Sequence, residues 1–84
     1  MTEKEIQLLG FEKHHDDGMG NLYDFYYYSY KIANGFELIS NANDELKEGE
    51  GWYVDFFESD PIIRFHKFEE VQSLINLIEK RIIK

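Results

Sequence analysis

Residues 22–32 are the most restrictive stretch of the sequence, because six of these eleven side chains are aromatic. Tyrosine and phenylalanine are favoured where a side chain packs on a pleated, half-buried surface. The stretch runs into Ala33-Asn34-Gly35, whose residue types are typical of a tight turn, and a second extended run follows at 36–39. We therefore predict a long central strand, a tight turn and an antiparallel partner strand.

The length of the hairpin loop decides which side chains share a face. A two-residue Asn34-Gly35 loop would mix charged and apolar side chains on both faces. A three-residue loop, with Gly35 left-handed in a bulge, instead gives three matched pairs. These pairs are Ile32 with Phe36, Lys31 with Glu37, and Tyr30 with Leu38. We predict the three-residue loop, because a slip of one residue would turn every side chain to the other face.

This register divides the hairpin into two faces. The predicted inner face carries Tyr26, Tyr28, Tyr30, Ile32, Phe36 and Leu38. The predicted outer face carries Tyr23, Phe25, Tyr27, Ser29, Lys31, Glu37 and Ile39.

Three further segments have the pattern of strands. Residues 52–57 alternate, so we predict one inward and one outward set: Trp52, Val54 and Phe56 inward, and Tyr53, Asp55 and Phe57 outward. Residues 62–65 follow a turn at Pro61, with Ile63 and Phe65 predicted inward. Residues 11–14 begin a possible first strand, and the residue types at 15–21 are typical of a loop. Residues 40–51 are interpreted as an exposed connection.

Helices are predicted at both ends of the chain. Thr2 followed by Glu5 is a capping-box pattern, and Gly10 fits the left-handed residue that closes a helix of about two turns. The clearer helix spans residues 68–83, where apolar residues recur at spacings of three and four: Phe68, Val71, Leu74, Ile75, Ile78 and Ile82. We expect this stripe to cover the inner face of the sheet.

The predicted fold is therefore α+β, an antiparallel meander sheet of four or five strands with the C-terminal helix packed on one face and a short N-terminal helix. With 84 residues, the chain is expected to form a single domain over 1–84. Its formal net charge of −8 works against direct binding to nucleic acid, and the absence of cysteine excludes disulfides and thiolate metal sites.

The sequence also bears on location and source. It shows no secretion signal and no apolar run long enough to span a bilayer, so we expect a cytoplasmic protein with no membrane partner. Residues with AT-rich codons abound, which is typical of a bacterial or phage genome of low GC content.

The most prominent cluster of potential metal ligands is His14-His15-Asp16-Asp17. Imidazole and carboxylate are the ligands of zinc and other divalent metals, and His66 is a candidate to complete a site. Adjacent residues on an extended chain point to opposite faces, however, so His14 and His15 would not readily hold one ion together. We predict a solvated loop, with no metal and no cofactor, and leave open whether this loop binds a metal.

Catalytic motifs are missing from the sequence. It has no Gly-x-Ser-x-Gly elbow, no phosphate-binding glycine loop and no dinucleotide fingerprint, so we expect no catalytic residues and no enzyme activity. Aromatic sheets also bind single-stranded nucleic acid, but those platforms need basic surroundings, whereas Asp24, Glu37 and Asp55 lie among these aromatic residues.

Three functions remain as hypotheses. The first is a small acidic protein-interaction or regulatory module that acts through an aromatic sheet face. The second is an acidic inhibitor of phage or mobile-element type that imitates the charge of nucleic acid. The third is a metal-dependent enzyme that uses the loop from His14 to Asp17.

The first hypothesis rests on the predicted outer face. One helix covers only one side of a small sheet, and exposed apolar patches larger than a few hundred Å² usually mark interaction sites. We therefore predict a homodimer or a protein partner on the outer face. The predicted anchors are Phe25, Tyr27, Tyr53 and Phe57.

Overall fold

The computed structural model describes residues 1–16, 25–43, 46 and 51–83. Five antiparallel strands form one sheet in the order β1-β2-β3-β4-β5, with a helix at each end of the described chain. The elements are α1 (Glu3–Leu8), β1 (Glu12–Asp16), β2 (Phe25–Ala33), β3 (Phe36–Ser40), β4 (Val54–Phe56), β5 (Arg64–Phe65) and α2 (Phe68–Arg81). This architecture confirms the predicted α+β fold, and the possible first strand at 11–14 is present as β1. The strand continues through Asp16, so the prediction of a loop was wrong for His15 and Asp16, and His14 is likewise part of the strand.

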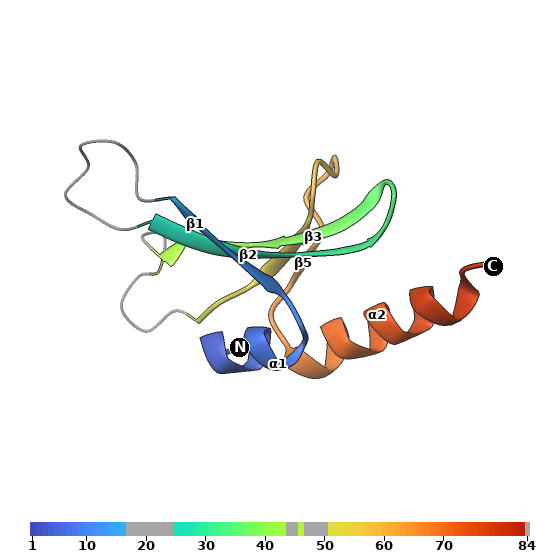
Figure 1. Ribbon diagram of the computed structural model, residues 1–84, viewed down its shortest axis with the longest axis horizontal. Coiled ribbons are helices and arrows are strands. Elements are labelled where there is room, and N and C mark those ends of the chain that lie inside the picture. The colour runs from blue at the N-terminus through green and yellow to red at the C-terminus, as the bar shows by residue number, and fades with distance from the viewer. Residues whose placement is uncertain (17–24, 44–45, 47–50, 84) are drawn as a thin grey trace.

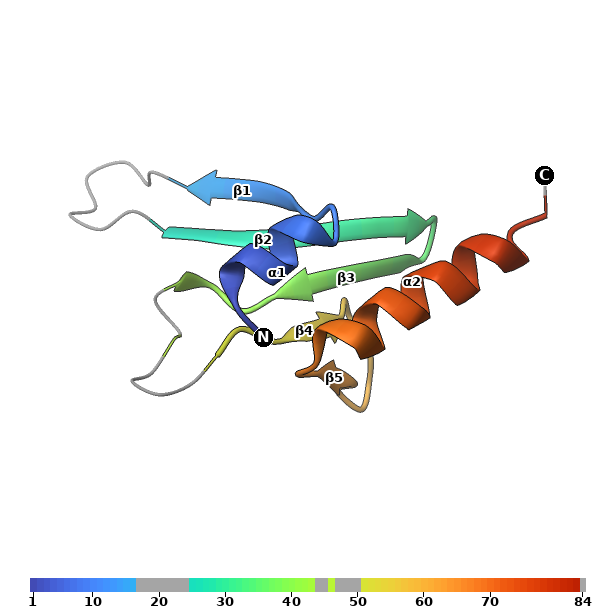
Figure 2. The same ribbon diagram turned by 90° about the horizontal axis from the view of Figure 1, so that it is seen from below.

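Both helices lie on the same side of the sheet, as Figures 1 and 2 show from two directions. The connection between β4 and β5, gold in Figure 1, rises from the opposite side at one end of the sheet. No described helix lies over that opposite side. We call it the uncovered face, and the side under α1 and α2 the covered face.

The core lies between the covered face and the two helices. Its buried side chains come from both helices and from the strands and their flanks: Ile6, Phe11, Tyr28, Leu38, Trp52, Val54, Val71 and Ile75. The inward assignment of Tyr28, Leu38, Trp52 and Val54 is confirmed, because each of these side chains is at most 6 % exposed. Phe65 packs against this cluster as predicted, whereas Ile63 is 46 % exposed and the prediction for it was wrong.

Polar contacts fasten α1 to the sheet. The Thr2 hydroxyl accepts from the Glu5 backbone N–H while the Glu5 carboxylate accepts from the Thr2 N–H, which confirms the capping box. Glu3 accepts hydrogen bonds from the hydroxyls of Tyr28, at 2.5 Å, and Tyr26, at 3.3 Å. Gly10 has a φ of 92°, the predicted left-handed conformation that lets the chain turn from α1 into β1.

The N-terminus takes the place of a ladder partner beside β4. The backbone N–H of Trp52 donates to the Met1 carbonyl, and the Met1 amino group donates to the carbonyls of Trp52 and His66. Because Trp52 pairs with Met1, the regular strand β4 begins only at Val54 and is shorter than the predicted 52–57. Trp52 and Tyr53 nevertheless keep their predicted inward and outward directions.

Helix α2 covers less of the sheet than its apolar stripe predicts. Val71 and Ile75 are buried, but Ile82 of the same stripe is 40 % exposed. Figure 2 shows the reason, because α2 crosses the sheet obliquely and its C-terminal end extends past the β2–β3 turn. The prediction that the whole stripe would be buried was wrong for this end of the helix.

The β2–β3 hairpin has the predicted pairs Tyr30 with Leu38 and Lys31 with Glu37. Its closing pair is Ala33 with Phe36, however, so the loop is the two-residue Asn34-Gly35 and the prediction of a three-residue loop was wrong. The predicted pair of Ile32 with Phe36 is absent, because the extra residue lies within β2, where the register shifts between Lys31 and Ala33. Gly35 has the predicted positive φ, 86°. Phe36, in the pair that closes the turn, is 51 % exposed and is not part of the core, so the prediction that it points inward into the core was wrong.

The connection after β3 was predicted to be exposed, and its first residues are not. Ser40, Asn41 and Ala42 are all less than 9 % exposed. The Ser40 hydroxyl accepts from the Tyr28 N–H, and the Asn41 side chain accepts from the Tyr53 N–H, so these polar side chains continue the sheet hydrogen bonding where the ladder stops. Residues 44–45 and 47–50 of the predicted connection lie outside the described residues.

Candidate functional site

The uncovered face presents one row of side chains that crosses all five strands. Direct register partners place these residues side by side in the order Glu12, Ser29, Ile39, Asp55 and Arg64. The row begins with an acidic residue at the β1 edge and ends with a basic residue at the β5 edge. In between, it carries a small polar side chain, an apolar one and a second carboxylate.

The β5 end of this row is held by an ion pair with fork geometry. Arg64 donates from Nε to Asp55 Oδ1 at 2.8 Å and from Nη2 to Asp55 Oδ2 at 3.1 Å. The same guanidinium lies over the ring of Tyr53, 3.9 Å from its centroid. A two-point ion pair fixes the plane of a guanidinium, so Arg64 is held over the Tyr53 ring in a defined orientation.

A second cluster lies toward the β1 edge. His14 Nε2 is 2.6 Å from the Ser29 hydroxyl oxygen, and the His14 ring stacks on Tyr27 with centroids 5.1 Å apart. Ser29 is only 8 % exposed, whereas His14 and Tyr27 are half-buried. Tyr27 is thus supported from the side by a ring and keeps part of its surface open.

Tyr27 and Tyr53 occupy related places on either side of β3. Each ring packs against a histidine nearer its own edge of the sheet. Tyr27 stacks on its register partner His14, and Tyr53 packs against His66 with ring centroids 6.0 Å apart. From the β1 edge to the β5 edge, the order across the face is therefore histidine, tyrosine, the central strand β3, tyrosine and histidine. This arrangement is nearly symmetric about β3.

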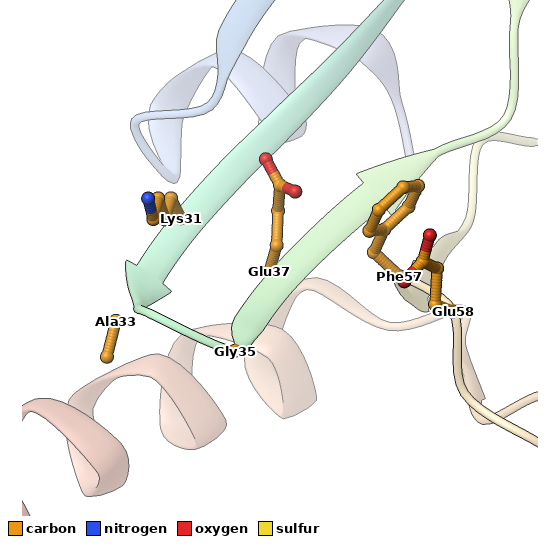
Figure 3. Close-up of a pocket in the computed structure, with 6 residues that line it drawn as sticks. All are labelled: Lys31, Ala33, Gly35, Glu37, Phe57 and Glu58. Atoms are coloured by element: carbon orange, nitrogen blue, oxygen red, sulfur yellow. The ribbon is translucent and has the colours of Figure 1, made fainter.

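The third aromatic side chain of the face lies beside a shallow depression at the turn end of the hairpin. The depression has a volume of about 280 Å³ and is lined by Lys31, Ala33, Gly35, Glu37, Phe57 and Glu58. Figure 3 shows these side chains, with Phe57 across from Glu37 of β3. Phe57 is 48 % exposed, and its backbone N–H donates to the Glu37 carbonyl at 2.8 Å. The backbone is therefore fixed while the ring is accessible.

The structure brings together most of the predicted anchors. Tyr27, Tyr53 and Phe57 lie on the uncovered face, on β2 and on either side of β4. Phe25 belongs to β2, but its side chain is outside the described ones, so its role stays a prediction. Sequence reasoning missed Arg64 and Glu12 as members of this face. Two signals could have identified Arg64. They are the alternation of side-chain directions along β5 and the turn that pairs β5 with β4, which places Arg64 beside Asp55.

The segment from His14 to Asp17 is divided between the two faces. His14 stacks on Tyr27 of the uncovered face, whereas the next residue, His15, stacks on Tyr26 of the covered face. Within the described residues, no three histidine or carboxylate side chains gather in a way that could hold a metal ion. The Asp16 side chain and Asp17 lie outside the described ones, so the segment stays open as a metal ligand.

Two further findings complete the description of the chain. Among the described residues, no helix has the length and apolar character needed to cross a membrane. No protein-family model matches the chain, and neither the curated proteins nor the solved structures that were compared include a match.

Proposed function

We propose that this protein is a small protein-interaction or regulatory module that binds its partner through the uncovered face and catalyses no reaction. The observation that carries the proposal is the placement of both helices on one side of the sheet (Figure 1), which leaves a face five strands wide without a helix among the described residues. A face of this kind that exposes apolar side chains as a contiguous patch is typical of an interaction site.

The chemistry of the face supports a protein as the partner. Tyrosine, phenylalanine and arginine are the residue types enriched at the centres of protein interfaces, and this face carries all three: Tyr27, Tyr53, Phe57 and Arg64. Each ring is partly accessible, while its backbone belongs to the sheet or is hydrogen-bonded to it. Rigid side chains lose little conformational entropy on binding, so they make efficient contacts.

The charges of the face argue against the alternative of a nucleic-acid mimic. Such a mimic needs an extended surface of one sign, whereas carboxylates here alternate with cations: Glu12, Glu37 and Asp55 lie among Lys31 and Arg64. A surface of mixed sign supports a specific orientation of a protein partner more than strong general attraction.

The proposal is tested by capture of partners with the wild-type chain and with the double variant Tyr27→Asp plus Phe57→Asp. Matched controls are Leu77→Asp and Leu8→Asp, since these apolar side chains are 53 % and 69 % exposed and belong to α2 and α1, on the other side of the sheet. We expect the double variant to lose at least about tenfold of the captured partner and the controls to keep it, because buried hot-spot residues dominate affinity. A cooperative melt of each variant verifies that it is folded.

Salt dependence separates the proposal from charge mimicry. Between about 50 mM and 500 mM salt, the affinity of an aromatic interface should change by less than about threefold, whereas a charge mimic should lose affinity steeply. Partner capture that collapses over this range, or that the double variant leaves unchanged, would overturn the proposed function.

A further inference from the structure

We propose that the uncovered face binds the same face of a second copy of this chain, with a twofold axis that runs along β3. The inference rests on the proposed function and names the partner. A rotation by 180° about that axis lays two uncovered faces on each other and exchanges β1 with β5 and β2 with β4. Contacts of this kind are self-complementary, because each residue pair occurs twice.

The five-strand row is complementary to itself under this rotation. It places Glu12 of each copy over Arg64 of the other, because these residues end the row at opposite edges of the sheet. Ser29 then faces Asp55 of the second copy, and Ile39 faces its own counterpart on the axis. A row with one acidic and one basic end matches its own reverse, so charge complementarity favours a second copy as the occupant.

The aromatic side chains fit the same axis. Tyr27 lies on β2 and Tyr53 lies directly before β4, on the other side of β3, so the rotation brings Tyr27 of one copy to Tyr53 of the other. Their histidine neighbours, His14 and His66, are exchanged in the same way. Aromatic pairs contribute about 0.5–1.5 kcal/mol beyond the area they bury, and this pair forms twice in the dimer.

The remaining features of the face are compatible with this packing. Glu37 on β3 comes near its own counterpart, and Lys31, its register partner, supplies a compensating cation in each copy. The β4–β5 connection, which rises from this side at one end (Figure 1), comes to lie toward the β1 edge of the second copy. Face-to-face sheets pack at about 30°, and long side chains such as Glu12 and Arg64 reach across the resulting offset.

The size of the face predicts a weak dimer. The five strands hold 5, 9, 5, 3 and 2 residues, and at about 3.4 Å along and 4.8 Å across a strand for each residue the sheet offers roughly 400 Å² per copy. The total of roughly 800 Å² is below the standard size of stable interfaces and is typical of weak, transient ones. We therefore expect association in the range of tens of micromolar.

Two single charge reversals, Glu12→Lys and Arg64→Glu, test the proposed geometry by sedimentation velocity. Each variant alone places like charges together at both ends of the row, so its dimer should be weaker than the wild-type dimer by at least about tenfold. An equimolar mixture of the two variants should form a heterodimer at close to wild-type affinity, because both end contacts are then between opposite charges. Salt near 150 mM keeps the effect short-ranged.

Matched controls carry the same charge changes on α2. These controls are Glu69→Lys and Lys80→Glu, which change exposed residues in the first and last turns of that helix. We expect neither variant to change association, alone or mixed. A wild-type chain that stays monomeric at hundreds of micromolar would overturn the inference, as would single reversals that dimerise normally or a mixture no stronger than either variant.

The same samples separate this inference from the proposed function. One outcome is that the wild-type chain is monomeric and captures another protein, which the double variant Tyr27→Asp plus Phe57→Asp does not capture. This outcome would overturn the twofold dimer and keep the interaction face. A monomer whose captured proteins are unaffected by that double variant would overturn both.

Discussion

Arg64 lies over Tyr53, with its guanidinium carbon 3.9 Å from the ring centroid, while Asp55 accepts two hydrogen bonds from the same guanidinium. Tyr53 is therefore held between the sheet and a cation whose orientation is fixed by a carboxylate. The side-chain exposures of Arg64 and Asp55 are 40 % and 20 %, so this cluster belongs to the surface of the molecule. An oriented surface cluster of this kind is suited to recognition more than to stability.

Replacing Arg64 should have little effect on folding. We expect Arg64→Ala to lower the free energy of unfolding by about 1 kcal/mol, because exposed ion pairs and exposed cation–π contacts each contribute about 1 kcal/mol or less. Arg64→Lys is the matched control, since it keeps the charge and removes the fork. Urea denaturation measures both, and a loss above about 2 kcal/mol for Arg64→Ala would show that the cluster is chiefly structural.

The β2–β3 turn provides a test of backbone conformation alone. Gly35 has a φ of 86°, and a Cβ added there would have no atom within 4 Å. We expect Gly35→Val to destabilise the protein by more than about 1 kcal/mol, because a β-branched residue resists positive φ whatever the space around it. Gly35→Asn should cost less, since asparagine tolerates this conformation. Equal melting temperatures for Val and Gly at this position would refute the turn geometry.

Two isoleucines of one helical stripe should differ sharply in their contributions. Ile75 is 5 % exposed against the core, whereas Ile82 is 40 % exposed where α2 extends past the sheet. We expect Ile75→Ala to cost about 2–5 kcal/mol and Ile82→Ala less than about 1 kcal/mol. Chemical denaturation of both variants measures the difference. Similar costs at the two positions would mean that α2 is covered along its whole length.

Alkaline pH should weaken the attachment of α1 to the sheet. Burial raises the pKa of the Tyr28 hydroxyl, and its hydrogen bond to the Glu3 carboxylate raises the pKa further. The folded state therefore favours the neutral phenol, so the stabilisation is complete below the unfolded pKa of about 10 and is lost as pH rises through the folded pKa.

Tyr28→Phe isolates this contribution. At about pH 8, Tyr28→Phe should lower the free energy of unfolding by roughly 1–3 kcal/mol, because the Glu3 carboxylate loses a hydrogen-bond donor. At about pH 10.5 the difference between wild type and variant in free energy of unfolding should be smaller than at pH 8, since only the wild type loses this stabilisation. The pKa values of Tyr26 and Tyr30 are also raised, but both proteins share them. Urea denaturation at the two pH values measures the gap, and a gap that stays constant would exclude the predicted linkage.

Local patterns in the sequence predicted most of the elements and part of each face of the sheet. The capping box at Thr2, the left-handed residues Gly10 and Gly35, and the alternation around Val54 each depend on neighbouring residues only, so they could be predicted without the fold. The outward positions of Tyr27 and Tyr53 followed from the same alternation. Period-two patterns specify which side chains share a face.

What the sequence could not predict depends on how elements meet. The angle of α2 decides that Ile82 is exposed, and no periodicity within the helix contains that angle. The pairing of Trp52 with Met1, which shortens β4, joins residues from opposite parts of the chain. The five-strand row from Glu12 to Arg64 likewise exists only once four registers are fixed together.

Photo-crosslinking from the uncovered face tests the central claim most directly. A photoreactive phenylalanine analogue replaces Phe57 in one sample and Leu77 of α2 in a control, since both side chains are about half exposed, at 48 % and 53 %. In extract of the cells that produce the protein, and at tens of micromolar for the purified chain, we predict a discrete crosslinked protein species from position 57 and none from position 77. Crosslinks from position 77 alone, or from neither position, would contradict the assignment of the uncovered face as the interaction surface.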